Sequence, residues 1–194
     1  MKKIKLLEVC NIRSGYTGFK NDKRNDKGNY MILQLRSVDS QGILDINGAV
    51  RFNEENVKDI HILKKGEIII RAKGRPSSAG YINLSFSNLV ASSQFLRISL
   101  KAKCEGELDT EYLWWFLNQK PAQDYYKNNS PGSAQASINK KTLENTEILL
   151  PTLEKQRRIA ELNRLRLEEK KLALELIEKR EKVINRIMFN FIKQ

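Results

Sequence analysis

The chain has 194 residues, with 35 Lys and Arg against 23 Asp and Glu, so its formal net charge is +12. A charge this positive favours a polyanionic partner, nucleic acid before an anionic membrane surface, although a basic surface that serves solubility alone stays open. No apolar run approaches the roughly 18 residues of a membrane-spanning helix, and Lys5 and Glu8 interrupt the N-terminal apolar stretch, so we expect a cytoplasmic protein with reduced cysteines and no membrane partner.

Residues 1–151 have the pattern of one domain that mixes strands and helices. Runs of β-branched and large apolar residues that alternate with polar ones predict strands at Ile4–Val9, Tyr30–Leu35, Glu67–Ala72, Gly80–Phe86 and Phe95–Leu100. Helices are expected at Thr110–Gln119, where Asp109 can cap the N-terminus, and around Ala122–Lys127. Because many strands precede few helices, the pattern predicts an α+β fold with a mixed sheet and not a doubly wound parallel sheet.

The composition changes at Pro151. Beyond it the chain contains neither Pro nor Gly, and Glu, Lys, Arg and Leu dominate. We therefore expect residues 152–194 to form one long C-terminal coiled-coil helix, a rod of roughly 60 Å. One apolar stripe along this helix consists of Leu162, Leu165, Leu172, Leu176, Val183 and Ile187. A second stripe beside it consists of Leu167, Leu174, Ile177, Ile184, Met188 and Phe191. A rod that outreaches its own domain predicts a homodimer through this helix; a helix folded back on its own domain is the alternative.

The sequence lacks the motifs of enzymes that modify or cut DNA. Its four prolines are never adjacent, which removes the Asn/Asp/Ser-Pro-Pro-aromatic loop of an amino-methyltransferase, and it has no Gly-rich phosphate loop with Lys-Ser/Thr. His61 is the only histidine, expected in a partly exposed strand or loop, and with Cys10 and Cys104 it cannot supply the ligands of a zinc site. We therefore expect no catalytic residue, no metal site and no cofactor in this chain.

Two loops rich in basic residues are candidates for contact with double-stranded DNA. The first combines side chains that can hold phosphates with amides that can read base edges, and its candidates are Lys20, Asn21, Lys23, Arg24 and Lys27. The second follows a predicted strand, and its candidates are Arg71, Lys73, Arg75, Ser77 and Tyr81. A solvated loop whose charges only maintain solubility is the alternative for each. Trp114 and Trp115 lie in an apolar helical segment, so we expect them in the core and not stacked on bases.

The stretch from Gly132 to Ala160 carries the most specific pattern in the chain. Its parts are a Gly-Ser turn, an Ile-x-Lys-x-x-Leu step, a short strand that ends in Leu-Pro, and Leu-Glu-x-Gln-x-x-Ile-Ala, at Gly132-Ser133, Ile138–Leu143, Ile148–Pro151 and Leu153–Ala160. This order resembles the end of the target-recognition domain and the start of the conserved helix in specificity subunits of type I restriction-modification systems. The segments Gly66–Arg71, Phe95–Ile98 and Tyr112–Leu117 are also similar to that family. The turn predicts a positive φ at Gly132 and a position close to DNA or a partner for Gly132, Ser133 and Gln135.

The resemblance implies an architecture and partners. Subunits of this family contain two recognition domains and two long helices that pair antiparallel, whereas this sequence has one domain, residues 1–151, and one helix, residues 152–194. It therefore resembles a half-length form that would be completed by a second copy or by another half. The implied partners are methyltransferase subunits and a motor-nuclease subunit, which would bind S-adenosylmethionine and ATP. Two alternatives stay open: a truncated interaction protein that sequesters methyltransferase subunits, and a standalone nuclease or methyltransferase.

Overall fold

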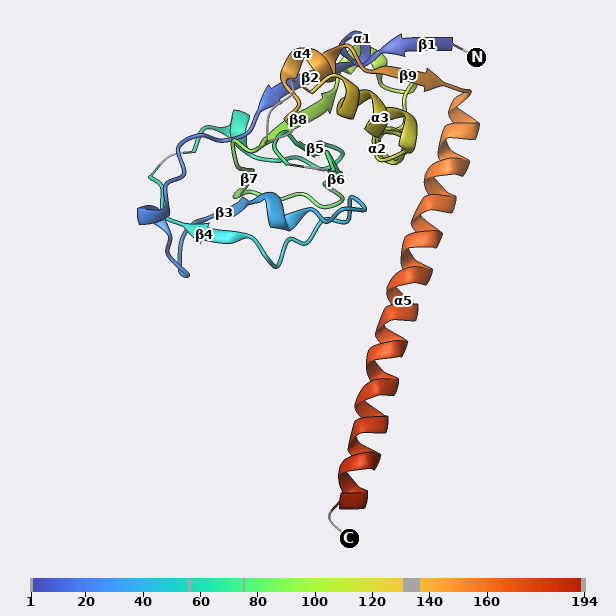
Figure 1. Ribbon diagram of the computed structural model, residues 1–194. Helices are drawn as coiled ribbons and strands as arrows, with labels where there is room; N and C mark the ends of the chain where they lie inside the picture. Colours follow the sequence, from blue (N-terminus) through green and yellow to red (C-terminus); the bar gives the residue numbers. More distant parts are fainter. Residues whose placement is uncertain (1, 56, 75, 131–136, 193–194) are drawn as a thin grey trace.

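The computed structural model describes residues 2–55, 57–74, 76–130 and 137–192 (Figure 1). A central four-stranded sheet has the order β2-β8-β5-β6, and each neighbouring pair is antiparallel. Its strands are β2 (Cys10–Ser14), β8 (Phe95–Leu100), β5 (Ile68–Arg71) and β6 (Ala79–Tyr81). The long strand β8 pairs along its length with both β2 and β5, so it holds this sheet together.

Two smaller sheets complete the strand content of the described residues. One is a three-stranded sheet with the order β4-β3-β7, in which β3 is antiparallel to β4 and parallel to β7. The other is the antiparallel pair of β1 and β9. Their bounds are β3 (Tyr30–Leu33), β4 (Val50–Phe52), β7 (Leu89–Ala91), β1 (Lys2–Lys5) and β9 (Glu147–Leu150). The β1–β9 pair joins the two ends of the globular part, by which we mean the described residues from 2 to 150. The sheets are mixed, and the predicted α+β fold class is confirmed.

Helices cover the central sheet and lead out of the globular part. The α-helices are α1 (Leu6–Val9), α2 (Thr110–Leu117), α3 (Lys120–Asn128), α4 (Lys140–Glu144) and α5 (Leu153–Ile192). Short 3-10 turns are η1 (Asn21–Lys23), η2 (Leu35–Ser37), η3 (Asp59–His61) and η4 (Ala102–Cys104). Among the helices of the described ranges, α5 included, none combines the length and the apolar content that spanning a bilayer requires.

Strand β5 lies between two hydrophobic cores. Side chains alternate between the faces of a strand, so Ile68 and Ile70 pack into a core with α2 and α3, whereas Ile69 packs into a second core with Leu33 and Phe95. All three isoleucines are buried. A run of consecutive β-branched residues is therefore explained by burial of the strand on both faces. The free thiols of Cys10 and Cys104 are buried in the first of these cores.

The sequence predicted β8 and the start of α2 correctly, but two strands end earlier than expected. Strand β8 has the predicted bounds, and Asp109 caps α2 by accepting a hydrogen bond from the backbone N–H of Tyr112 at 2.9 Å. The strand expected at Ile4–Val9 is wrong, because its second half turns into α1. The strand expected at Gly80–Phe86 ends at Tyr81, and three short strands, β2, β4 and β7, were not predicted. Strands β4 and β7, with three residues each, are too short to show an alternating pattern.

The first turns of helix α5 are packed against the globular part. The Gln156 side chain is fully buried: its Oε1 accepts from the backbone N–H of Asp109 at 2.8 Å, and its Nε2 donates to the carbonyls of Glu107 and Pro151 at 3.0 and 2.9 Å. Ala160 and Asn163 are the other buried residues of the helix. The glutamine of the Leu-Glu-x-Gln pattern therefore joins the helix to the loop that precedes α2.

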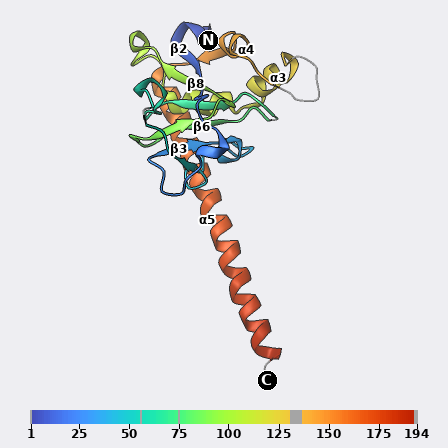
Figure 2. The same ribbon diagram turned by 90° about the vertical axis from the view of Figure 1, so that its left-hand side faces the viewer.

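Beyond its first turns, α5 leaves the globular part and projects far past it (Figures 1 and 2). Lys170 donates a hydrogen bond to Gln41, and every described residue from Lys171 to Ile192 is exposed. The alternative of a helix folded back along its own domain is therefore wrong. The predicted helix itself is confirmed, with its first residue at Leu153.

Candidate nucleic-acid interface

The first basic loop lies at the end of the globular part opposite α5 (Figure 1). It runs beside β4, where the backbone N–H of Asn25 donates to the carbonyl of Arg51 at 3.1 Å. Gly28 allows this close approach, because a Cβ atom there would lie 2.4 Å from the carbonyl oxygen of Phe52. Of the predicted contacts in this loop, Lys20, Arg24 and Lys27 are exposed, and Asn21 opens η1. The structure therefore brings these four candidates into one loop that is fixed against a sheet.

Lys23 differs from its neighbours because it is ion-paired. Its Nζ lies 2.5 Å from Oε2 of Glu54, which also accepts a hydrogen bond from the Tyr16 hydroxyl at 3.1 Å. The hydrogen bond between them raises the pKa of Lys23 and lowers the pKa of Glu54, so both groups are charged at neutral pH. The Asn29 side chain holds the backbone of Glu54 with two hydrogen bonds. Its Nδ2 donates to the Glu54 carbonyl at 2.7 Å, and its Oδ1 accepts from the Glu54 N–H at 3.1 Å. Lys23 therefore holds the loop in place, and its charge is already compensated.

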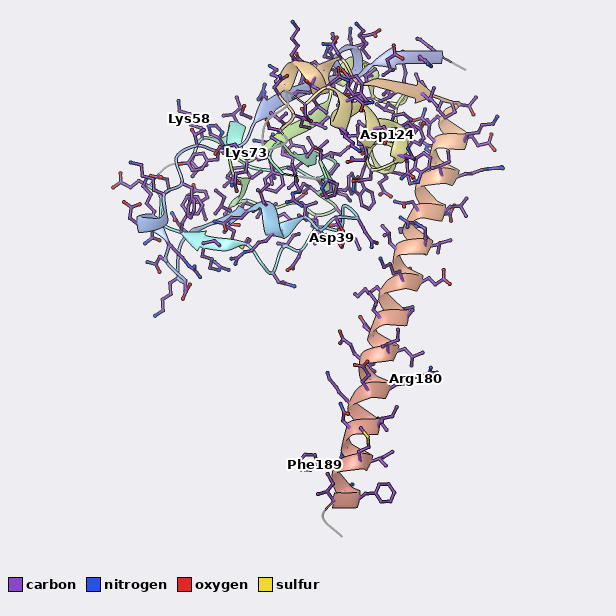
Figure 3. All side chains as sticks on the ribbon, in the orientation of Figure 1. Asp39, Lys58, Lys73, Asp124, Arg180 and Phe189 are labelled. Atoms are coloured by element: carbon purple, nitrogen blue, oxygen red, sulfur yellow. The ribbon has the colours of Figure 1, made fainter. Side chains whose placement is uncertain are left out.

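The second candidate segment is divided between surface and interior. Lys73 is exposed and lies away from α5, on the side of the globular part where Lys58 also lies (Figure 3). Arg71, at the end of β5, is half-buried, and its Nε has no hydrogen-bond partner among the described atoms. Ser77 is buried, and its carbonyl accepts from Nε2 of Gln123 at 3.1 Å. The structure therefore does not bring Ser77 to the surface beside Lys73.

Tyr81 lies toward α2 and α5, apart from the basic loops. Its ring stacks on Trp114 with centroids 5.7 Å apart, its hydroxyl is 3.3 Å from Oγ1 of Thr110, and burial raises its pKa. Trp114 donates from Nε1 to the carbonyl of Ala79 at 2.7 Å, and both Trp114 and Trp115 pack against the first core. The prediction that the two tryptophans belong to the core is confirmed. Four further predicted contacts, Arg75, Gly132, Ser133 and Gln135, lie outside the described residues.

Two arginines that the sequence did not single out lie with Arg24. Arg36 in η2 and Arg51 on β4 line a surface pocket of about 300 Å³ together with Arg24, Asp26 and Asn47. All three arginines are exposed. A weak sequence signal existed at Arg51, because it stands between Val50 and Phe52, and alternation in a strand turns such a residue to the opposite face. No sequence pattern relates Arg36 to either of the others.

The ion pair between Arg97 and Glu67 holds the segment around η3 in place. Arg97 on β8 is 6% exposed, and its guanidinium contacts Glu67 at 2.8 Å and donates to the carbonyls of Ile60 and Ile62 at 2.7 and 3.0 Å. Between those two carbonyls, His61 is half-buried in η3, with its ring 5.3 Å from the ring of Tyr16. Burial lowers the pKa of His61, and the charges of Arg97 and Lys58 lower it further. Nowhere in the described part of the chain do three or more His, Cys, Asp or Glu side chains gather to hold a metal ion.

The first apolar stripe of α5 is uncovered along its whole length. The exposed fractions of its side chains range from 50% to 67%, and its members are Leu162, Leu165, Leu172, Leu176, Val183 and Ile187. The second stripe differs at its beginning, where Leu167 and Leu174 face Trp114 and Ile43 across a groove between α5 and the globular part. An exposed apolar surface of this length is typical of a surface that binds another protein.

One family model and several solved structures match this chain. The family model described as "Type I restriction modification DNA specificity domain" matches residues 1–193. A chain from work on complex assembly and conformational transition of the type I R-M system matches with a TM-score of 0.63 and 20% identity, over 88% of this chain and 39% of that chain. The S subunit of a type I restriction-modification system from M. genitalium matches with a TM-score of 0.60 and 19% identity, over 93% and 42%. The HsdS subunit from Thermoanaerobacter tengcongensis matches with a TM-score of 0.59 and 19% identity, over 86% and 37%.

This chain spans about two fifths of the length of each of these solved structures. At such low identity, their likeness establishes a shared fold. No curated protein sequence matches the chain significantly. The family model covers nearly all of the sequence, from β1 through the basic loops to the end of α5, and the chain therefore belongs to the type I restriction modification DNA specificity domain family.

Proposed function

We propose that this chain is the DNA-reading subunit of a type I restriction-modification system and has no catalytic centre of its own. The observation that carries the proposal is the family match over residues 1–193, which includes both the globular part and the long helix. In this proposal residues 1–151 are a target-recognition domain, and residues 152–194 determine spacing and bind partners. The chain directs methyltransferase and motor-nuclease subunits to their target, and those partners bind S-adenosylmethionine and ATP.

The charge distribution supports DNA binding by the domain. Residues 1–151 carry a net charge of +7, and residues 152–194 carry +5 on a helix that contains charged side chains of both signs. The exposed basic side chains of the first loop stand on a segment that Gly28 and the Lys23–Glu54 pair fix against β4. Contacts to phosphate determine where a protein sits on DNA, and amides such as Asn25 in the same loop can then read base edges.

The exposed stripe of α5 supports a homodimer. Antiparallel pairing of two copies would bury Leu165, Leu172 and Leu176 of each helix, which are at least half exposed in the single chain. It would also place the two domains at opposite ends of the paired rods. A symmetric dimer presents the same reading surface twice, so the expected target is a short sequence and its inverted copy, separated by a spacer that is not read. The second stripe then remains for methyltransferase subunits.

Selection from a randomised pool of duplexes by the purified chain tests this proposal. We expect enrichment of one short sequence in inverted repeat about a fixed spacer, and light scattering should give the mass of a dimer at tens of micromolar protein. Enrichment of no sequence would contradict DNA reading. If such a chain still captured methyltransferase subunits through α5, it would be the sequestering protein that is the alternative. Cleavage or methylation of DNA by the pure chain would contradict the non-enzymatic role.

A further inference from the structure

Three arginines from separate segments line one concave surface of the globular part. Arg24 belongs to the first basic loop, Arg36 to η2 and Arg51 to β4, and the pocket that they share has a volume of about 300 Å³. The first basic loop and β4 are held together by the backbone hydrogen bond from Asn25 to the Arg51 carbonyl, and by one from the Arg51 guanidinium to the carbonyl of Gly28 at 3.3 Å. The positions of Arg24 and Arg51 relative to each other are therefore determined by the fold, and Arg36 lines the same pocket from η2.

Positive charge exceeds negative charge in this pocket, where three arginines stand against one carboxylate among the described residues that line it. No ion pair joins Arg24, Arg36 or Arg51 to a carboxylate within the described ranges, although Asp26 lines the same pocket. Lys23, in contrast, has Glu54 as its partner. Like charges that are held together repel one another, and a bound anion removes that repulsion. A guanidinium also presents a planar set of donors that fits the oxygens of a phosphate group.

We propose that Arg24, Arg36 and Arg51 bind a backbone phosphate of the target DNA and so fix the position of the domain on the duplex. The inference rests on the proposed function and names the contact surface that this function uses. A phosphate fits better than a base, because one arginine already satisfies the two acceptors of a guanine edge, whereas the oxygens of one phosphate can accept from several guanidinium groups. The ion-paired Lys23 is then a residue that holds the loop and does not contact DNA.

The test uses the full chain and compares losses of equal charge. Arg36→Gln and the double variant Arg24→Gln/Arg36→Gln leave the hydrogen bond of Arg51 intact, so their fold should be preserved, and thermal unfolding checks this. Arg180→Gln is the matched control for Arg36→Gln, and Arg180→Gln/Arg186→Gln is the matched control for the double variant, because both residues are exposed on α5 and Arg180 lies far from the pocket (Figure 3). The affinity of each protein is measured over a range of salt concentrations for a duplex selected by the wild type and for a scrambled duplex.

For the double variant we expect the slope of log affinity against log salt to fall by up to about 0.9, the value for one lost phosphate contact, because the three arginines share one phosphate. The fall should be equal for both duplexes, and both control variants should keep the slope of the wild type. An unchanged slope in the double variant would overturn the proposal, and so would a loss of affinity confined to the selected duplex, because that result would assign the arginines to a base. If the wild type bound both duplexes equally, the proposed sequence-specific reading would be wrong, but phosphate binding by the three arginines would stand. If the wild type bound neither duplex, both proposals would be wrong.

Discussion

Replacement of Gln156 by Met removes the polar connection between α5 and the globular part without removing its volume. Gln156 is fully buried and makes three hydrogen bonds, with the backbone N–H of Asp109 and with the carbonyls of Glu107 and Pro151. A typical hydrogen bond contributes about 1 kcal/mol net, and a buried group left without a partner costs about 1–3 kcal/mol. A swap to a side chain of similar volume adds little further cost. We therefore expect Gln156→Met to lower the free energy of unfolding by about 3 kcal/mol or more.

Urea unfolding followed by circular dichroism measures this loss. Gln41→Met is the matched control, since Gln41 makes the other polar contact to α5, through Lys170, but is exposed. Surface substitutions of this kind change the free energy of unfolding by less than about 0.5 kcal/mol. If Gln156→Met cost less than about 1 kcal/mol, or no more than the control, the three buried hydrogen bonds would not be what fixes the helix, and this reasoning would be refuted.

Three further predictions concern the ion pair, the histidine and the helix. Arg97→Met leaves Glu67, whose side chain is only 14% exposed, without its ion-pair partner, so unfolding studies should show a loss of about 3–5 kcal/mol, and a loss below about 1 kcal/mol would contradict this. Because the pKa of His61 is lowered in the folded chain, the imidazole is protonated in the unfolded chain first as pH falls below about 6.5, and the free energy of unfolding should decrease. His61→Gln should flatten this pH dependence, and equal pH profiles of the variant and the wild type would refute the prediction. Leu172→Lys/Leu176→Lys should convert the proposed dimer to a monomer by light scattering, and a variant that stays dimeric would exclude the stripe as the interface.

Features determined by neighbouring residues could be predicted from the sequence. The absence of Pro and Gly after Pro151 and the two stripes predicted α5, and Asp109 before an apolar run predicted the start of α2. The motif that contains Gln156 indicated the family, but not why the glutamine is there. Its three partners lie in loops of the globular part, and a polar residue near the start of a charged helix gives no sign that it is buried.

The candidate site depends on contacts between distant residues, which periodicity does not encode. Lys23 was grouped with Lys20 and Lys27 because the three are close in sequence. Glu54, 31 positions after Lys23, compensates the charge of Lys23 alone among these three lysines. Arg36 and Arg51 were missed because each stands alone in its segment and only the β3–β4 sheet and η2 bring them to Arg24. A count of charges can predict that a surface is basic. Which of those charges remain free is decided by the tertiary fold.

The most direct test of DNA reading is the methylation pattern of DNA in cells that express this chain with methyltransferase subunits. We expect one methylated motif, with two short elements separated by a fixed spacer, and we expect it to disappear when the chain is omitted. Exchange of residues 1–151 for another recognition domain should change the elements and keep the spacer. Methylation that is the same with and without the chain would contradict the claim that this protein selects the sequence.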